Sequence, residues 1–139
     1  MKTEEAVILL AHGSQSSGAG EGVQEVASQV RDRLGGSRVI LAFLQFNHPN
    51  LAEAIEQAVA EGMKRIVVVP FFLASGAHVR EDIPEGLKQA RLKNPGAEIL
   101  LSPPLLPDPR IAEILVDRVG EALTKERSGE DEHASTRDR

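Results

Sequence analysis

A run of β-branched residues without polar interruption, Ile66 to Val69, constrains the fold of this chain more than any other feature. A strand whose two faces are both buried has this pattern, and such strands lie inside parallel sheets. Pro70 and the small residues Ala74 to Ala77 interrupt the strand and predict a loop. This loop carries His78 just before a helix that we expect to begin near Asp82. We therefore predict that Ile66 to Val69 forms the centre of the sheet.

Three more segments have the length and the apolar character of strands: Ala6 to Ala11, Val39 to Phe46, and Ala97 to Ser102. Apolar residues recur at helical spacing in the segments between and after them, over residues 23–34, 51–61, 82–92 and 111–123. Strands that alternate with helices predict an α/β fold, a four-stranded parallel sheet with helices on both faces. We expect the strand order 2-1-3-4, which places strands 1 and 3 side by side at the switch point of the topology.

Composition narrows the possible functions. The chain has 139 residues and no cysteine, so a thiolate metal site is excluded and one domain, residues 1–124, is expected. Residues 125–139 are charged and nearly free of apolar side chains, which predicts a disordered tail. A net charge of −5 argues against nucleic-acid binding. Neither a membrane-spanning run nor a signal-peptide pattern is visible, so we expect a cytoplasmic protein without a membrane partner.

Histidines follow two of the predicted strands at the edge where ligands bind in such folds. His12 follows the first strand and His78 follows the third, while Gln45, Asn47 and His48 lie at the end of the second or beyond it. Two histidines from adjacent strand ends can share a divalent cation or accept protons. They could equally serve only as hydrogen-bonding residues of their loops. For His48, within an Asn-His-Pro-Asn turn before a helix, the structural interpretation is favoured.

The loop after the first strand is rich in small residues. Ser14, Ser16 and Gly18 could cradle an anion at the start of the next helix. The loop lacks the lysine of a phosphate-binding P-loop, so no nucleotide is expected. Phosphoryl transfer through His12 is disfavoured as well, because no arginine precedes it to bind the phosphoryl group.

Three sequence blocks carry a family resemblance: LLAHGSQ at residues 9–15, AFLQFNHPNL at 42–51 and VVVPFFLASGAHVREDIP at 67–84. In order and spacing they resemble the blocks of the small, single-domain sirohydrochlorin cobaltochelatases of the class II chelatase superfamily. The Gly-x-His-x-x-x-Asp-Ile-Pro pattern after a valine-rich strand is the specific part, and the resemblance covers roughly residues 5–123. It implies a flavodoxin-like fold of the kind that forms half of a larger chelatase.

The resemblance also implies an activity, the insertion of a divalent metal into a tetrapyrrole without ATP. Co2+ and sirohydrochlorin, in the biosynthesis of cobalamin or a related cofactor, are expected as substrates; Fe2+ or Ni2+ insertion and a non-catalytic metal or tetrapyrrole carrier are the alternatives. By position, His12 and His78 match the metal-binding and catalytic histidines of the family. The substrate-facing residues that we expect are Ser14, Gln45, His48, Ser75, Gly76 and Arg80, with Arg110 as a further candidate for its carboxylates.

The chain departs from the family pattern at two positions. Gln45 stands where relatives often have a metal-binding glutamate, and His48 stands where a second acidic residue is common. The ligand set and the preferred metal therefore stay open.

We also expect a homodimer, because a tetrapyrrole is broad and larger class II chelatases place two such domains in one chain. Four apolar residues are candidates for its interface or for the lining of the cleft: Phe71, Phe72, Leu105 and Leu106.

Overall fold

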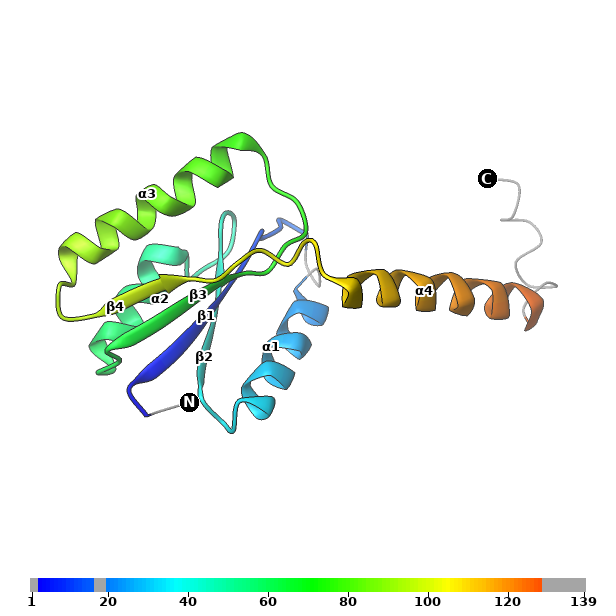
Figure 1. Cartoon of the computed structure of the whole chain (residues 1–139), viewed down its shortest axis with the longest axis horizontal. Helices are drawn as coiled ribbons and strands as arrows, with labels where there is room; N and C mark the ends of the chain where they lie inside the picture. Colours follow the sequence, from blue (N-terminus) through cyan, green and yellow to red (C-terminus); the bar gives the residue numbers. More distant parts are fainter. Residues whose placement is uncertain (1–2, 17–19, 129–139) are drawn as a thin grey trace. The chain divides into compact units, whose positions relative to one another are not determined.

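The structure, a computed structural model, describes residues 3–16 and 20–128. By its internal contacts the chain divides into two units, residues 1–105 and residues 106–139, and each is described by itself. In the first unit, strands alternate with helices (Figure 1): β1 (Glu5–Ala11), α1 (Glu21–Arg33), β2 (Arg38–Phe43), α2 (Leu51–Ala60), β3 (Arg65–Pro70), α3 (Ala77–Lys93) and β4 (Glu98–Leu101). The second unit contains α4 (Pro109–Ser128).

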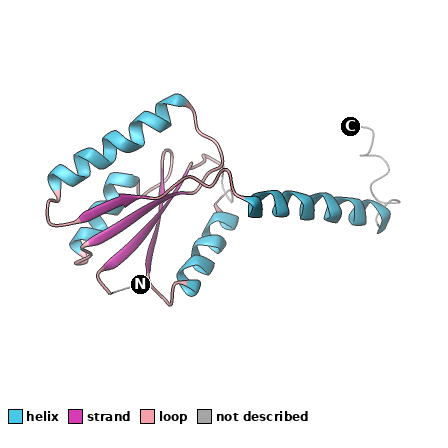
Figure 2. Ribbon diagram, in the orientation of Figure 1, coloured by secondary structure: helices cyan, strands magenta, loops and turns pink. Residues whose placement is uncertain are grey.

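The strands form one parallel sheet in the order β2-β1-β3-β4 (Figure 2), which confirms the predicted fold class and strand order. In the register, Ile8 of β1 lies beside Ile40 of β2 on one side and Val68 of β3 on the other. The carboxyl ends of β1 and β3 are therefore neighbours, as the expected switch point requires.

Side chains that alternate along β1 form a separate cluster on each face of the sheet. Ile8 and Leu10 are fully buried in the larger cluster, together with Ile55 of α2 and Leu87 of α3. Val7 and Leu9 point to the other face, where residues of α1, such as Ala27, pack on them. Both faces of the sheet are thus covered by helices, as predicted.

Two predicted boundaries at the functional edge are wrong. β2 ends at Phe43 and not at Phe46, because Phe46 has a left-handed backbone with φ 66° and the chain turns there. α3 begins at Ala77 and not near Asp82, so His78 is the second residue of a helix and not a loop residue. Pro84 lies inside this helix, although proline is tolerated best in the first turn.

Two expectations about the helices also differ from the structure. The apolar pattern over residues 82–92 predicts that Leu92 faces inward with Ile83 and Leu87, but its side chain is 69% exposed and Ala90 takes the inner position. α4 continues to Ser128, so the first residues of the expected disordered tail are helical. The rest of that tail, residues 129–139, lies outside the described residues.

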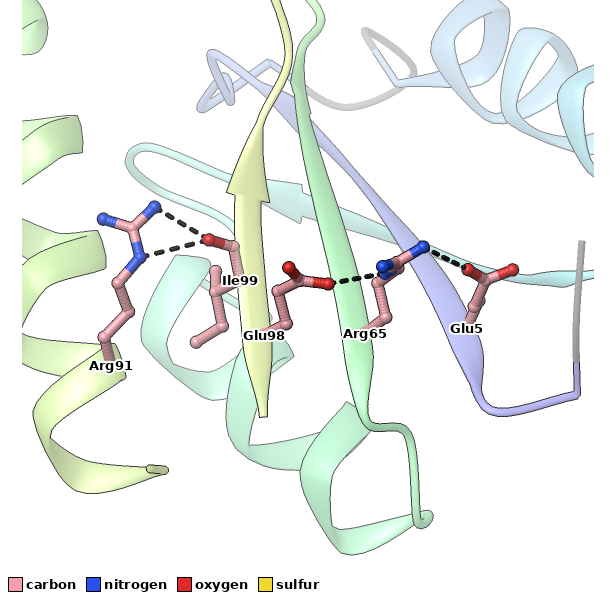
Figure 3. Close-up of polar contacts among 5 residues, drawn as sticks. All are labelled: Glu5, Arg65, Arg91, Glu98 and Ile99. Carbon is pink, nitrogen blue, oxygen red and sulfur yellow. Dashed lines mark hydrogen bonds and ion pairs between the residues drawn. The ribbon is translucent and has the colours of Figure 1, made fainter. Parts of the chain in front are cut away.

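Ionic contacts connect the strands at the amino end of the sheet, opposite the histidine loops (Figure 3). Arg65 on β3 pairs with Glu98 on β4 at 2.6 Å and with Glu5 on β1 at 3.3 Å. Arg91 of α3 donates two hydrogen bonds, of 3.1 and 2.8 Å, to the carbonyl of Ile99 in the short edge strand. These contacts align β4 with the sheet at the amino ends of the strands. The histidines follow the opposite, carboxyl ends.

Candidate functional site

The loops after β1 and β2 are hydrogen-bonded to each other beyond the ends of their strands. The backbone nitrogen of Leu44 donates to the carbonyl of Ala11 at 2.9 Å, and that of Gln45 donates to the carbonyl of His12 at 3.2 Å. Two positions further along each chain, the backbone nitrogen of Ser14 donates to the side-chain oxygen of Asn47 at 2.8 Å. The main chain on both sides of His12 is therefore anchored to the neighbouring loop.

Gly13 makes this close approach of the two loops possible. Its φ is +89°, in the left-handed region that side-chain-bearing residues rarely adopt. A Cβ atom at this position would overlap the carbonyl oxygen of Gln45. Both the backbone conformation and the lack of space for a side chain therefore require glycine between His12 and Ser14.

A first hollow of about 250 Å³ opens beside these loops. His12, Ser14 and Asn47 give it polar groups, and Phe71 provides part of an apolar wall. Its other lining residues are Ala11, Gly13, Ser16, Gly20, Val23 and Phe43. A mostly apolar hollow with a few converging polar groups is typical of a small-molecule site.

A second hollow, of about 180 Å³, lies against the segment after β3. Phe72, Ser75 and Arg80 contribute to its lining, which is otherwise almost entirely apolar. The His12 ring contacts Phe72 edge-on, with ring centroids 5.4 Å apart and ring planes at 60°. Phe71 lines the first hollow and Phe72 the second, and these two side chains pack on opposite faces of the sheet, so His12 lines the first hollow and contacts the second only through the Phe72 ring. Its exposed imidazole is available as a ligand or as a proton acceptor there.

His78 comes to the same edge of the sheet on the first turn of α3. Gly76 is the residue before the helix and has no side chain with which to cap it. The His78 side chain is exposed, and it lies six residues after Phe72, the ring that His12 contacts. The structure thus places both predicted histidines on segments that follow adjacent strands, β1 and β3.

Gln45 and His48 are exposed residues of the loop after β2, and neither lines one of the two hollows. Gln45 contributes its backbone, which donates to His12 and accepts from Asn47 at 2.8 Å. His48 Nδ1 lies 2.7 Å from the carboxylate of Glu53 at the start of α2. His48 therefore has a structural contact, which supports the interpretation that the sequence favoured for it.

Of the two arginines considered for substrate carboxylates, Arg80 is the better placed, because it lines the second hollow. Arg110, in the other unit, forms two hydrogen bonds to the carboxylate of Asp108, at 2.9 and 2.7 Å. These bonds lower the pKa of Asp108 to about 2. The guanidinium of Arg110 is thus already engaged by an ionised carboxylate.

Sequence reasoning placed Asn47 on this edge but gave it no role, and it missed why Gly13 must be glycine. The contact between Asn47 and Ser14 joins residues 33 positions apart, so no local pattern signals it. The only signal in the sequence is that each lies within a few residues of a predicted strand end.

Two kinds of feature are absent from the described residues. No group of three or more histidine, cysteine, aspartate or glutamate side chains in residues 3–16 and 20–128 is arranged to hold a metal ion. No helix within these ranges has the length and hydropathy needed to cross a bilayer.

The parallel sheet with histidines beyond two adjacent strands defines the class of this protein as a parallel α/β domain with a candidate site at the carboxyl ends of its strands. Residues 6–122 match the CbiX family model, and the chain belongs to this family. A sirohydrochlorin cobaltochelatase of Methanopyrus kandleri is 34% identical in an alignment that covers 87% of this chain and 99% of the relative. That of Sulfurisphaera tokodaii is 36% identical over 119 residues, which cover 84% of this chain and 92% of the relative. The family resemblance expected from the sequence is confirmed.

Solved structures give the same fold. A CbiX protein of cobalamin (vitamin B12) biosynthesis from Marinobacter aquaeolei VT8 aligns with a TM-score of 0.75 at 29% identity, over 87% of this chain and 98% of the other. The sirohydrochlorin chelatase SirB of Bacillus subtilis subspecies spizizenii, in complex with cobalt, aligns with a TM-score of 0.77 at 24% identity. The alignment covers 84% of this chain but 50% of the SirB chain, so this chain corresponds in fold to about half of SirB.

Proposed function

We propose that this protein inserts Co2+ into sirohydrochlorin without ATP, as a cobaltochelatase of cobalamin or related tetrapyrrole biosynthesis. The observation that carries the proposal is the exposed His12 ring, which lines the first hollow and contacts Phe72 on the segment that leads to His78. Membership of a family whose relatives are named sirohydrochlorin cobaltochelatase supports the choice of substrate.

Metal insertion makes two chemical demands that histidines meet. Water must leave the metal ion as the pyrrole nitrogens replace it, so the protein ligands must hold the ion without trapping it. Two protons must also leave the pyrrole nitrogens, and this requires bases that titrate near neutral pH. His12 and His78 are assigned to both tasks, with the metal and the tetrapyrrole as the two substrates.

The two hollows suggest how the organic substrate is held. Phe71 and Phe72, one in each hollow, are assigned to contacts with the tetrapyrrole ring system, and Arg80 in the second hollow is available to a peripheral carboxylate. Ser14 and Ser75 add polar groups in the first and second hollow, respectively. We assign supporting roles to three residues on neighbouring segments. Gln45 acts through its backbone hydrogen bonds and His48 through its contact with Glu53. Gly76 is the residue that directly precedes α3.

We further propose that the active form is a homodimer in the cytoplasm. Each hollow is small beside a tetrapyrrole, and a second copy would provide a facing wall. Leu106 is 41% exposed, and several apolar residues of α4 are more exposed than that: Ile114, Leu115, Val116, Val119 and Leu123. Within its own unit α4 does not bury these side chains, and apolar groups gathered on one element in this way favour burial against another surface, which we assign to the second copy. Phe71, Phe72 and Leu105 are half-buried and are kept as candidates for the lining of the cleft.

Absorption spectroscopy with sirohydrochlorin and Co2+ tests the activity. Catalytic amounts of protein should convert an excess of tetrapyrrole to its cobalt form faster than the uncatalysed reaction. A spectral change that stops at one equivalent of protein would instead indicate a carrier. Parallel assays with Fe2+ and Ni2+ compare the alternative metals, and a greater rate with either would replace cobalt as the proposed substrate.

A further inference from the structure

We propose that Asn47 is a positioning residue for His12, acting through the backbone of Ser14. The inference rests on the proposed function in one respect, namely that His12 takes part in metal insertion. The Asn47 side chain is the last link between the loops after β1 and β2, and its Oδ1 accepts the Ser14 N–H at 2.8 Å.

Asn47 continues a hydrogen-bond series that the backbone alone cannot extend. The backbone nitrogens of Leu44 and Gln45 donate to the carbonyls of Ala11 and His12, so the two chains still run side by side past the strand ends. At Phe46 the chain turns back, and the backbone nitrogen of Asn47 bonds to the carbonyl of Gln45 at 2.8 Å. The side chain of Asn47 then supplies the acceptor that the backbone of its loop no longer offers to Ser14.

The turn at Phe46 is costly to form, which indicates that the surrounding structure maintains it. With φ 66° and a hydrogen bond between residues two positions apart, it matches the rare γ-turn with positive φ. Phe46 is also 57% exposed, so burial of its ring does not explain the conformation. Strained backbone of this kind persists where other contacts determine it, and such sites gather around functional residues.

The effect of the turn reaches His12 from two sides. The carbonyl of His12 accepts a hydrogen bond from the backbone nitrogen of Gln45, just before the turn. The backbone nitrogen of Ser14 donates to the side chain of Asn47, just after the turn. The ring of His12 contacts Phe72 from the neighbouring loop. Asn47 therefore limits the movement of the backbone that carries the imidazole, and reactions that need several groups in register are sensitive to such movement.

The test compares Asn47→Ala, which removes the acceptor, with Asn47→Asp, which retains an oxygen at the same place. Asn94→Ala is the matched control, because Asn94 also bonds through its side chain to a backbone group, the carbonyl of Ala90, but at the far end of α3. For Co2+ insertion, Asn47→Ala should lower kcat about tenfold or more with little change in KM. Asn47→Asp should restore most of kcat, and Asn94→Ala should leave it near the wild-type value.

A second readout does not require chelatase activity: the His12 imidazole signals in the NMR spectrum of each variant. These signals should shift or broaden in Asn47→Ala, return toward the wild-type position in Asn47→Asp, and stay unchanged in Asn94→Ala. If Asn47→Ala does not fold, Asn47→Ser, whose hydroxyl is shorter, provides the same comparison.

The proposal is overturned if removal of the acceptor leaves both kcat and the His12 signals unchanged. It is also overturned if Asn47→Asp is as defective as Asn47→Ala with a raised KM, because Asn47 would then contact the substrate through its amide nitrogen. If the wild-type protein inserts no metal while the NMR pattern is as expected, the proposed function fails and the positioning of His12 by Asn47 stands.

Discussion

The backbone of Gly13 lies so close to the carbonyl oxygen of Gln45 that a Cβ atom on the glycine would overlap it. This packing joins the loops after two neighbouring strands directly beside His12. We predict that Gly13→Ala destabilises the protein by roughly 3 kcal/mol or more, because a backbone group cannot yield as a flexible side chain can. Chemical denaturation followed by circular dichroism measures the change.

Gly35→Ala is the matched control for this substitution. Gly35 also has a positive φ, +76°, but a Cβ atom there would meet nothing within 4 Å. Its replacement should cost about 1–2 kcal/mol, the strain of a left-handed backbone alone. Equal losses in the two variants would show that the contact with Gln45 has no steric consequence.

We predict that His12→Ala and His78→Ala each abolish most metal insertion while the protein stays folded. Both side chains are exposed, so their removal leaves no cavity in the core. Loss of a general base alone lowers rates about 100-fold or more, and loss of a ligand adds to this. Initial rates with Co2+ and sirohydrochlorin provide the measurement, and Gln89→Ala, an exposed change further along α3, provides the control. If either alanine variant keeps near wild-type turnover, the histidine that it replaces has only a structural role.

The sheet was predictable because its strands are nearly continuous apolar runs, such as Ile66 to Val69. Runs of this kind are stable only where both faces of the strand are buried, inside a parallel sheet. The edge that carries the histidines was less predictable, since its conformation depends on contacts distant in the sequence. The helix that was expected to begin near Asp82 begins about five residues earlier in the structure, at Ala77, and Pro84 lies inside it. The turn at Phe46 has no glycine or asparagine at its left-handed position, so local residue preferences predicted more strand.

Gln45→Glu should preserve activity and tighten metal binding. Among the described residues the Gln45 side chain is exposed and lines neither hollow, so a carboxylate fits there without repacking. A carboxylate is also a stronger ligand for divalent ions than an amide oxygen. Titration of Co2+ by calorimetry checks the prediction, and an affinity that is unchanged or weaker would place position 45 away from the metal.

The start of α2 should lose stability in acid. Asn50 and Glu53 form a capping box in which each side chain accepts the other's backbone N–H, at 2.8 Å in both cases. The Asn50 N–H and His48 lower the pKa of Glu53 below its ordinary value of 4.5. The contribution of a carboxylate with a lowered pKa is present above that ordinary value and is lost as the pH falls through the lower folded-state pKa.

Two substitutions separate the parts of this box. Asn50→Ala should cost about 1 kcal/mol at neutral pH, the usual loss for removal of an N-cap. Glu53→Gln keeps an oxygen acceptor but does not titrate, so its stability should vary less with pH than that of the wild type. Urea denaturation from pH 3 to pH 7 makes the comparison. Parallel curves for the wild type and Glu53→Gln would contradict the role given to the ionised carboxylate.

The last prediction concerns the exposed apolar residues of α4. Leu115 and Val119 are each 60% exposed and lie four positions apart, so they share one side of the helix. In a homodimer this side would be buried, and light scattering should give twice the 15.0 kDa mass of one chain. The double variant Leu115→Ser/Val119→Ser should shift the mass toward one chain at micromolar concentration. Glu113→Ser/Asp117→Ser changes the polar side of the same helix to the same residue type, and this control should remain a dimer. A wild-type protein that is monomeric while fully active would disprove the dimer, and a serine double variant that stays dimeric would exclude α4 from its interface.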